Sequence, residues 1–280
     1  MIPASFNYKK ASSVEEALSM LDDDAQVLGG GHSLIPALKL RLNAPGTLVD
    51  ISKIAAIKGI SDNDKSVTIG GGATHASIAS DAALAEHCPM MGQAAREIGD
   101  IQVRNVGTIG GSIAHADPAA DWPAVLLAAD ANVVIRNKSG KRVVDIDQFF
   151  KGFYETALEE GEIITTVSIP KTAFNRNSTY VKFKQPASRF ALVGCAVAIE
   201  MDGGVVKTAR VALTGVGEYA YRATNVEKAL KGQPLNAASI EAAVTNVTDG
   251  VDVMSDHYAS KKYRTHLAHV FVKRALKNLM

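Results

Sequence analysis

Three clusters of glycine constrain the fold of this chain more than any other feature of its sequence. Gly29–Gly31 and Gly70–Gly72 each follow a strand-like apolar run, and Gly107 stands shortly before Gly110 and Gly111. Glycine has no Cβ, so the backbone can adopt positive φ and its N–H groups can converge on an anion. The usual anion in such segments is a phosphate or pyrophosphate. The clusters therefore predict either tight turns or a phosphate-binding site.

The residue order in these clusters excludes two familiar nucleotide-binding motifs. A dinucleotide fingerprint reads G-x-G-x-x-G, but Leu34 stands where the third glycine would follow Gly29 and Gly31, and His75 stands there after Gly70 and Gly72. The phosphate-loop motif G-x-x-x-x-G-K-[ST] does not occur. A nucleotide bound here would need separate glycine loops rather than one loop and one helix.

Composition narrows the class of protein. The 280 residues are 47% hydrophobic and carry a formal net charge of +1. This length predicts two domains or three small ones. The near-zero net charge predicts no nucleic-acid partner and no anionic membrane partner. The N-terminus lacks a signal-peptide pattern and no apolar run is long enough for a transmembrane segment, which predicts a cytoplasmic protein.

The cysteine count limits the redox chemistry. Cys88 and Cys195 are the two cysteines of the chain, far apart and in unlike contexts. Two thiols provide neither a disulfide framework nor the four ligands of a zinc or iron–sulfur site. The sequence therefore predicts idle thiols in a reducing compartment and no metal site.

Hydrophobic periodicity predicts a mixture of helices and strands. The expected helices are Ser12–Leu21, a segment opened by Pro36, two helices between Thr74 and Gly99, Trp122–Ala129, Ala223–Lys231, Ser239–Val247 and Tyr258–Leu279. The expected strands include Ala25–Leu28, Gly46–Ser52, Ser66–Ile69, Asn132–Arg136, Glu162–Pro170 and a hairpin that turns at Asp202–Gly204. The segment around Gly107–Ser112 is expected to be a glycine-rich connection. A change in the sequence pattern near residues 171 to 178 predicts a domain boundary.

Three motifs, taken together and in order, carry a family resemblance. They read GGGHSLIPALKLR, DIQVRNVGTIGGSIAHADPAADWP and KFKQPASRFALVG. The chain resembles, over nearly its whole length, the FAD-binding medium subunit of molybdenum hydroxylases, the carbon monoxide dehydrogenase and xanthine dehydrogenase family. The resemblance implies an α+β fold: a vanillyl-alcohol-oxidase (PCMH)-type FAD-binding domain over residues 1–174, with two α/β subdomains at about 1–58 and 59–174. A smaller C-terminal α+β domain of the CO dehydrogenase flavoprotein type would cover residues 175–280.

The same resemblance implies noncovalent FAD and a set of site residues. Two glycine loops would wrap the FAD pyrophosphate, Asp121 would hydrogen-bond the flavin nucleotide, Ile98 and Ile164 would line the cofactor, and Lys184 would lie near the ring or its phosphates. The full set implied for the cofactor is Leu28, Gly29, Gly30, Gly31, His32, Ser33, Leu34, Ile35, Ile98, Thr108, Ile109, Gly110, Gly111, Ser112, Asp121, Ile164 and Lys184.

Three other residues have less defined expectations. We expect His32 to contact the cofactor without a covalent bond, and His115 to be a loop residue rather than a proton donor or a metal ligand. Phe190 either stacks near the flavin ring or is an ordinary core aromatic, and the sequence leaves both roles open. No residue is expected to act as a general acid or base.

The resemblance also implies partners and an electron-transfer function. A large subunit would carry molybdopterin, a small subunit would carry [2Fe–2S] clusters, and two such heterotrimers would pair into a heterohexamer. Electrons would pass through FAD to an external acceptor, either NAD or a quinone. The substrate of the complex stays open among CO, aldehydes, purines and N-heterocycles. Two alternatives are a self-sufficient flavin oxidoreductase resembling the enolpyruvyl sugar reductase and a non-catalytic assembly protein without flavin.

Overall fold

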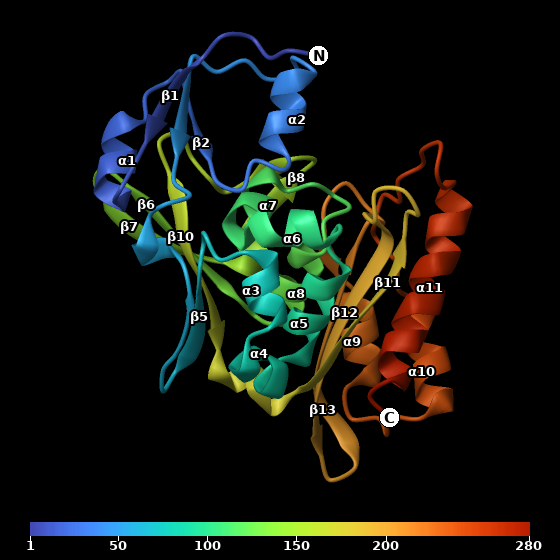
Figure 1. Cartoon of the computed structure of the whole chain (residues 1–280). Helices are drawn as coiled ribbons and strands as arrows, with labels where there is room; N and C mark the ends of the chain where they lie inside the picture. Colours follow the sequence, from blue (N-terminus) through green and yellow to red (C-terminus); the bar gives the residue numbers. More distant parts are fainter.

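The fold contains three larger β-sheets and a small two-stranded sheet, with helices packed against the larger ones (Figure 1). The computed structural model describes residues 1–280, except for the side chains of Phe174 and Asn175. Helices α3 to α8 lie between the second sheet and the third, and helices α9 to α11 cover the outer face of the third sheet (Figure 1). In the described part of the chain, no helix combines the length and the hydropathy that crossing a membrane requires.

The N-terminal unit is a small parallel sheet. Its strands are β1 (Asn7–Lys10), β2 (Ala25–Leu28) and β3 (Thr47–Asp50), in the order β1-β3-β2. Helix α1 (Val14–Met20) begins where the Ser13 hydroxyl accepts the Glu16 N–H at 3.0 Å, which confirms the predicted capped helix. Helix α2 (Leu34–Lys39) follows the first glycine cluster. Strand β1 was not predicted, because its sequence NYKK is polar and exposed and contains no apolar alternation.

The second sheet is antiparallel, in the order β4-β5-β10-β6-β7. Its strands are β4 (Ile60–Asp62), β5 (Ser66–Gly70), β6 (Asn132–Asn137), β7 (Gly140–Asp145) and β10 (Ile163–Pro170). β10, the central strand, is the predicted strand that ends at Pro170. Val67, Val133 and Val167 are fully buried against the central helices. A short hairpin of β8 (Phe150–Gly152) and β9 (Glu155–Thr156) stands beside this sheet.

Short helices, most of them capped by a side chain, form the central layer. They are α3 (His75–Ala79), α4 (Ala82–His87), α5 (Pro89–Glu97), α6 (Ile101–Val106), α7 (Ile109–His115) and α8 (Trp122–Ala128). The side chains of Thr74, Asp81, Asp100 and Thr108 each accept a backbone N–H in the first turn of the following helix. These caps satisfy donors that a short helix would otherwise leave open, which favours several short helices over one long one.

Helix α7 overturns the expectation that the segment around Gly107–Ser112 is a glycine-rich connection. Glycine inside a helix costs about 1 kcal/mol relative to alanine, so the sequence pattern argued against a helix. In the structure, a Cβ on Gly110 would lie 2.6 Å from the carbonyl oxygen of Gly71. Glycine therefore lets α7 pack directly on the turn after β5, and tertiary packing outweighs helix propensity.

The third sheet has the order β11-β12-β13-β14. Its strands are β11 (Asn177–Lys184), β12 (Ala191–Asp202), β13 (Val205–Thr214) and β14 (Tyr221–Arg222). Gly203 and Gly204 form the predicted two-residue hairpin turn, with φ of 56° and 84°. On β12, Val193 and Val197 face helices α9 (Thr224–Leu230), α10 (Ala237–Val244) and α11 (Lys261–Lys277). The small residues Ala196 and Ala198 face the central helices, so this sheet packs closely on α5 and α8.

Candidate cofactor site

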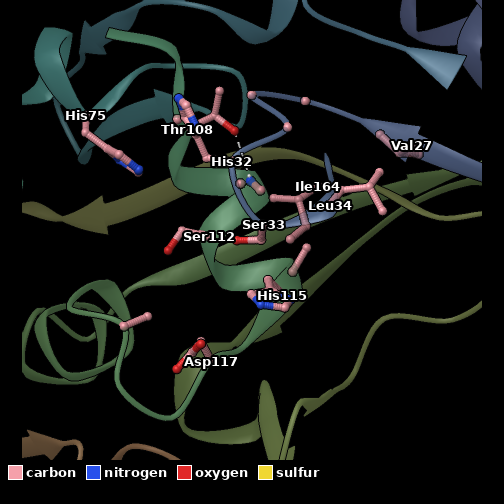
Figure 2. Close-up of a pocket in the computed structure, with 18 of the residues that line it drawn as sticks. Val27, His32, Ser33, Leu34, His75, Thr108, Ser112, His115, Asp117 and Ile164 are labelled. Atoms are coloured by element: carbon pink, nitrogen blue, oxygen red, sulfur yellow. Dashed lines mark hydrogen bonds between the residues drawn. The ribbon is translucent and has the colours of Figure 1, made fainter. Parts of the chain in front are cut away.

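A cavity of about 580 Å³ lies where the N-terminal unit, the central helices and the third sheet meet. Its walls come from the loop after β2, the start of α7, the start of β10 and the loop between β11 and β12. This volume is typical of sites that hold small-molecule ligands and cofactors. Figure 2 shows Thr108, Ser112 and His115 along α7 in this cavity, with Asp117 beyond the end of the helix.

The first glycine loop presents free backbone donors. After β2 the chain turns through Gly29–Ser33 into α2, and Gly31 adopts a left-handed φ of 72°. Within the described part of the chain, the N–H groups of Gly30, Gly31, His32 and Ser33 donate to no protein acceptor. All four residues line the cavity. Backbone N–H groups that converge without internal partners suit the oxygen atoms of a pyrophosphate.

The second glycine loop is built differently. The N–H groups of Ile109, Gly110 and Ser112 donate to the carbonyl oxygens of Ala73, Gly71 and Thr108 at 2.9 to 3.0 Å. The Gly111 N–H donates to the Thr108 hydroxyl at 3.1 Å. This loop therefore offers the hydroxyls of Thr108 and Ser112 and an unobstructed surface, rather than a second row of free amides.

The glycines also allow the loops to touch one another. A Cβ on Gly30 would lie 2.3 Å from the Val106 carbonyl oxygen and 2.8 Å from the Gly107 Cα. A Cβ on Gly107 would lie 2.8 Å from His75 Nε2. Separations this short do not occur for real Cβ atoms. The first and third glycine clusters are thus needed for backbone-to-backbone packing at the cavity wall.

The structure brings most of the predicted site residues to this cavity. Those that line it are Gly29, Gly30, Gly31, His32, Ser33, Leu34, Ile98, Thr108, Gly110, Gly111, Ser112, Asp121 and Ile164. Leu28, Ile35, Ile109 and Lys184 are not among the lining residues. Ile109 is fully buried in the core, Ile35 is exposed, and the Lys184 ammonium lies 3.3 Å from the Glu97 carboxylate at the surface. Of the residues with open roles, His115 and Phe190 both line the cavity, and His115 is the last residue of α7 rather than the expected loop residue.

A buried ionic cluster forms part of the wall, and sequence reasoning found only its carboxylate. The Lys182 ammonium lies 2.8 Å from Asp121 Oδ1, and the Tyr180 hydroxyl donates to the same carboxylate. Burial raises the pKa of Asp121, while the charge of Lys182 and its hydrogen bond oppose that shift. Lys182, two residues before Lys184 on β11, is therefore the buried lysine at this site. No local spacing distinguishes the two lysines.

Other lining residues were also missed by the sequence analysis. Glu162 is paired with Arg142, whose Nε donates to the carboxylate at 2.8 Å. At the tip of the β8–β9 hairpin, the Tyr154 hydroxyl donates to Asp117 at 3.0 Å. Burial, with the charge of Asp117, raises the pKa of Tyr154 to about 12. These contacts join residues distant in sequence, which explains why no motif reveals them.

His75 lies in the wall with its tautomer fixed by a tryptophan. The Trp122 indole N–H donates to His75 Nδ1 at 3.0 Å, and both side chains are buried. An indole nitrogen can only donate, so Nδ1 must be the acceptor and the neutral imidazole carries its proton on Nε2. Burial lowers the pKa of His75 to about 4, and the nearby charges of His32 and Arg104 act in the same direction.

This arrangement predicts a specific acid sensitivity. Between its ordinary pKa of 6.5 and about 4, His75 takes up a proton in the unfolded chain but not in the folded one, so stability falls as pH falls through this window. The full contribution is about 3 kcal/mol. In His75→Asn the amide oxygen can still accept from Trp122 but cannot be protonated. We expect urea unfolding at a series of pH values to show the variant gaining about 3 kcal/mol relative to wild type between pH 6.5 and 4. Parallel stability curves would contradict the assignment.

The cysteines and the other metal-binding side chains offer no metal centre among the described residues. No group of three or more His, Cys, Asp or Glu side chains is placed to hold an ion there. Both thiols are buried, and burial raises the pKa of Cys88 to about 12 and raises that of Cys195 as well. They are inert thiols at ordinary pH.

The cavity fits a dinucleotide cofactor on structural grounds. Free amides at the first loop suit a pyrophosphate, the absence of a Cβ at Gly30 lets the two loops touch, and Ile98 and Ile164 supply an apolar wall. A cavity with these features defines the protein as one that binds a nucleotide cofactor.

Comparison with known proteins identifies the family. Residues 4–172 match the model of the FAD binding domain in molybdopterin dehydrogenase, and residues 178–279 match the CO dehydrogenase flavoprotein C-terminal domain. The glyceraldehyde dehydrogenase medium chain of Sulfolobus acidocaldarius is 36% identical over 281 residues, covering 100% of both chains. The carbon monoxide dehydrogenase medium chain of Hydrogenophaga pseudoflava is 37% identical over 279 residues, covering 99% of this chain and 97% of the relative.

Solved structures agree with the sequence comparisons. Carbon monoxide dehydrogenase from Hydrogenophaga pseudoflava, in a form lacking the Mo-pyranopterin moiety, matches with a TM-score of 0.95 and 38% identity, covering 100% of this chain and 98% of that one. Quinoline 2-oxidoreductase from Pseudomonas putida 86 matches with a TM-score of 0.94 and 31% identity, covering 100% and 98%. The chain therefore belongs to the FAD-binding medium subunits of the molybdenum hydroxylases, the carbon monoxide and xanthine dehydrogenase family. The expected family, fold class and cofactor are confirmed.

Proposed function

We propose that this chain is the electron-transfer subunit of a molybdenum hydroxylase complex. A large molybdopterin subunit would oxidise the substrate, a small subunit would deliver the electrons through [2Fe–2S] clusters, and this chain would pass them to NAD or a quinone. Medium chains of carbon monoxide and glyceraldehyde dehydrogenases among the relatives support this assembly. We propose a dimer of heterotrimers in the cytoplasm as part of the same hypothesis.

The residues of this chain bind and orient the cofactor in this proposal. The amides of Gly30–Ser33 would bind the pyrophosphate, which offsets its desolvation without adding a buried charge. Ile98 and Ile164 would exclude water from the ring, and the Asp121 carboxylate would hydrogen-bond the flavin nucleotide. When bound, FAD supplies a carrier that handles both single-electron and two-electron transfer. The free amides of the first loop are the observation that carries the proposal.

The division of the chain is a further part of the proposal. We place the boundary of the FAD-binding domain after residue 174, with subdomains at about 1–58 and 59–174 and the second domain at 175–280. The two family models support it, because one ends at residue 172 and the other begins at residue 178. The helical turn Lys171–Asn175 joins β10 to β11 at this point.

One purification tests the proposed function. We expect the tagged chain, co-expressed with the reading frames next to its gene, to copurify with a large molybdopterin protein and a small iron–sulfur protein. The chain purified alone should carry one FAD and no stoichiometric iron. Turnover of NAD(P)H and substrate by the chain alone would favour a self-sufficient oxidoreductase. A colourless chain that fails to bind added FAD would favour an assembly protein.

A further inference from the structure

Lys182 makes three hydrogen bonds from one buried ammonium group. Its side chain is 1% exposed. The Nζ atom donates to Asp121 Oδ2 at 3.1 Å and to the carbonyl oxygens of Glu97 at 2.9 Å and Arg189 at 2.8 Å, and it lies 2.8 Å from Asp121 Oδ1. A lysine ammonium has three N–H donors, so these contacts can use all of them. The group is fully satisfied without water or ligand.

The three acceptors belong to three separate segments of the cavity wall. Glu97 ends α5 and immediately precedes Ile98 and Gly99, which line the cavity. Asp121 immediately precedes α8 and lines the cavity itself. Arg189 belongs to the lining loop Ser188–Phe190, between β11 and β12. One ammonium on the third sheet therefore connects two segments of the central helical layer to the lining loop Ser188–Phe190.

The loop Ser188–Phe190 depends on such anchors. Arg189 adopts a left-handed φ of 63°, a conformation that a residue with a side chain keeps only when its surroundings impose it. Its guanidinium donates to the Gly99 carbonyl oxygen at 2.9 Å, and its N–H donates to the Gln185 carbonyl oxygen at 2.9 Å. Phe190, 44% exposed, follows directly and lines the cavity. The contacts of Arg189 thus help to position Phe190, whose carbonyl oxygen also accepts the Gln185 N–H at 2.8 Å.

We propose that Lys182 is a positioning residue: it holds the loop Ser188–Phe190 against the cavity and thereby controls how firmly FAD is retained and how easily small molecules reach it. This inference rests on the proposed function, because it takes the cavity to be the FAD site. Removing the ammonium takes a partner from the Arg189 carbonyl oxygen, from the Glu97 carbonyl oxygen and from the Asp121 carboxylate together. The loop then keeps the Arg189 side-chain contact at Gly99 and the backbone hydrogen bonds that Gln185 makes with Arg189 and Phe190.

Lys184 provides a matched control on the same strand. It lies two residues after Lys182 on β11, and its side chain is 44% exposed. It carries the same charge and pairs with the Glu97 carboxylate at 3.3 Å, but does not line the cavity. Lys184→Met therefore removes one charge from the same neighbourhood without touching the loop Ser188–Phe190.

Hydrogen exchange of the FAD-free protein tests the loop directly. In Lys182→Met we expect amides in the peptide 185–190 to exchange at least about tenfold faster than in wild type, because loop opening is governed by local stability. In Lys184→Met they should exchange at the wild-type rate. Unchanged exchange in Lys182→Met, whatever its FAD affinity, would overturn the proposal. This measurement needs no cofactor, so a negative result contradicts the role of Lys182 without contradicting the proposed function.

Flavin measurements test the consequence for the cofactor. In Lys182→Met the Kd for FAD should rise by about tenfold or more, and iodide should quench the bound flavin more strongly. Lys207→Met, which removes an exposed lysine of β13 outside the cavity, should match wild type in both. Equal Kd and equal quenching in Lys182→Met would overturn the link between the loop and the cofactor. If wild type itself binds no FAD, the proposed function is wrong. The exchange measurement still decides whether Lys182 holds the loop Ser188–Phe190.

A double variant keeps the test informative if Lys182→Met does not fold. Asp121→Asn with Lys182→Met removes both charges, so no buried carboxylate is left unpaired. Compared with Asp121→Asn alone, the double variant should show the faster exchange in peptide 185–190. The same exchange in the two proteins would overturn the proposal, because only the ammonium differs between them.

Discussion

Gly30→Ala is expected to weaken FAD binding by at least about 100-fold, which corresponds to about 2.7 kcal/mol. The new Cβ would lie 2.3 Å from the Val106 carbonyl oxygen and 2.8 Å from the Gly107 Cα. Both obstacles are backbone atoms, which cannot rotate away as a side chain would, so the two loops must separate. Separation moves the free amides of the first loop away from the wall formed by α7. Titration of the purified apo-protein with FAD, followed by flavin fluorescence, measures the change.

Gly29→Ala is the matched control for this prediction. Its Cβ would lie 3.3 Å from the Thr108 hydroxyl, a side-chain atom that can shift by the few tenths of an ångström needed. We expect a Kd for FAD within about threefold of wild type, since a change below 1 kcal/mol is usual where nothing rigid is displaced. Similar Kd values for Gly30→Ala and Gly29→Ala would show that contact between the loops does not control binding. Circular dichroism should show the same secondary structure in both variants.

Trp122→Ala is expected to lower the free energy of unfolding by about 3–5 kcal/mol. Trp122 is fully buried at the start of α8, within the cluster shared by the second sheet, the central helices and the third sheet. Removing the indole leaves a large cavity in that cluster and also takes the hydrogen-bond donor from His75 Nδ1. Urea unfolding followed by far-UV circular dichroism measures the loss.

Two further variants separate the loss of the hydrogen bond to His75 from the loss of buried apolar volume. Trp122→Phe keeps most of the apolar volume but leaves His75 Nδ1 without its donor, so we expect a loss of about 1–3 kcal/mol. Phe153→Ala removes an aromatic that is 58% exposed at the tip of the β8–β9 hairpin, and should change stability by about 0.5 kcal/mol or less. A loss for Trp122→Ala no larger than for Phe153→Ala would contradict the placement of the indole in the shared core.

Apolar runs and turn residues made most of the fold predictable. The central strand β10, the hairpin at Gly203 and Gly204, and the capped helix α1 all follow local rules of periodicity, turn geometry and capping. In two of the elements that escaped prediction, β1 and α7, local preference and tertiary packing disagree. β1 is polar because it lies at the edge of its sheet, and α7 contains glycines because it packs directly on the Gly71 backbone.

The site was predictable only where a motif lies within one segment. The two glycine loops were found in this way, whereas His75 and Trp122 meet across 47 residues and Lys182 meets Asp121 across 61. For the lysines, alternation places Lys182 and Lys184 on the same face of β11, and the choice between them depends on where α5 ends and the loop Ser188–Phe190 begins. That is information about tertiary structure which no spacing in the sequence contains.

The contact between Trp122 and His75 gives the protein an intrinsic optical reporter. Trp122 is the single tryptophan of the chain, and its hydrogen-bond partner lines the cofactor cavity. Flavins absorb light in the range in which indoles emit, so emission from this one ring should dim as the cavity fills. Cofactor uptake and release can therefore be followed in real time with the unlabelled native chain.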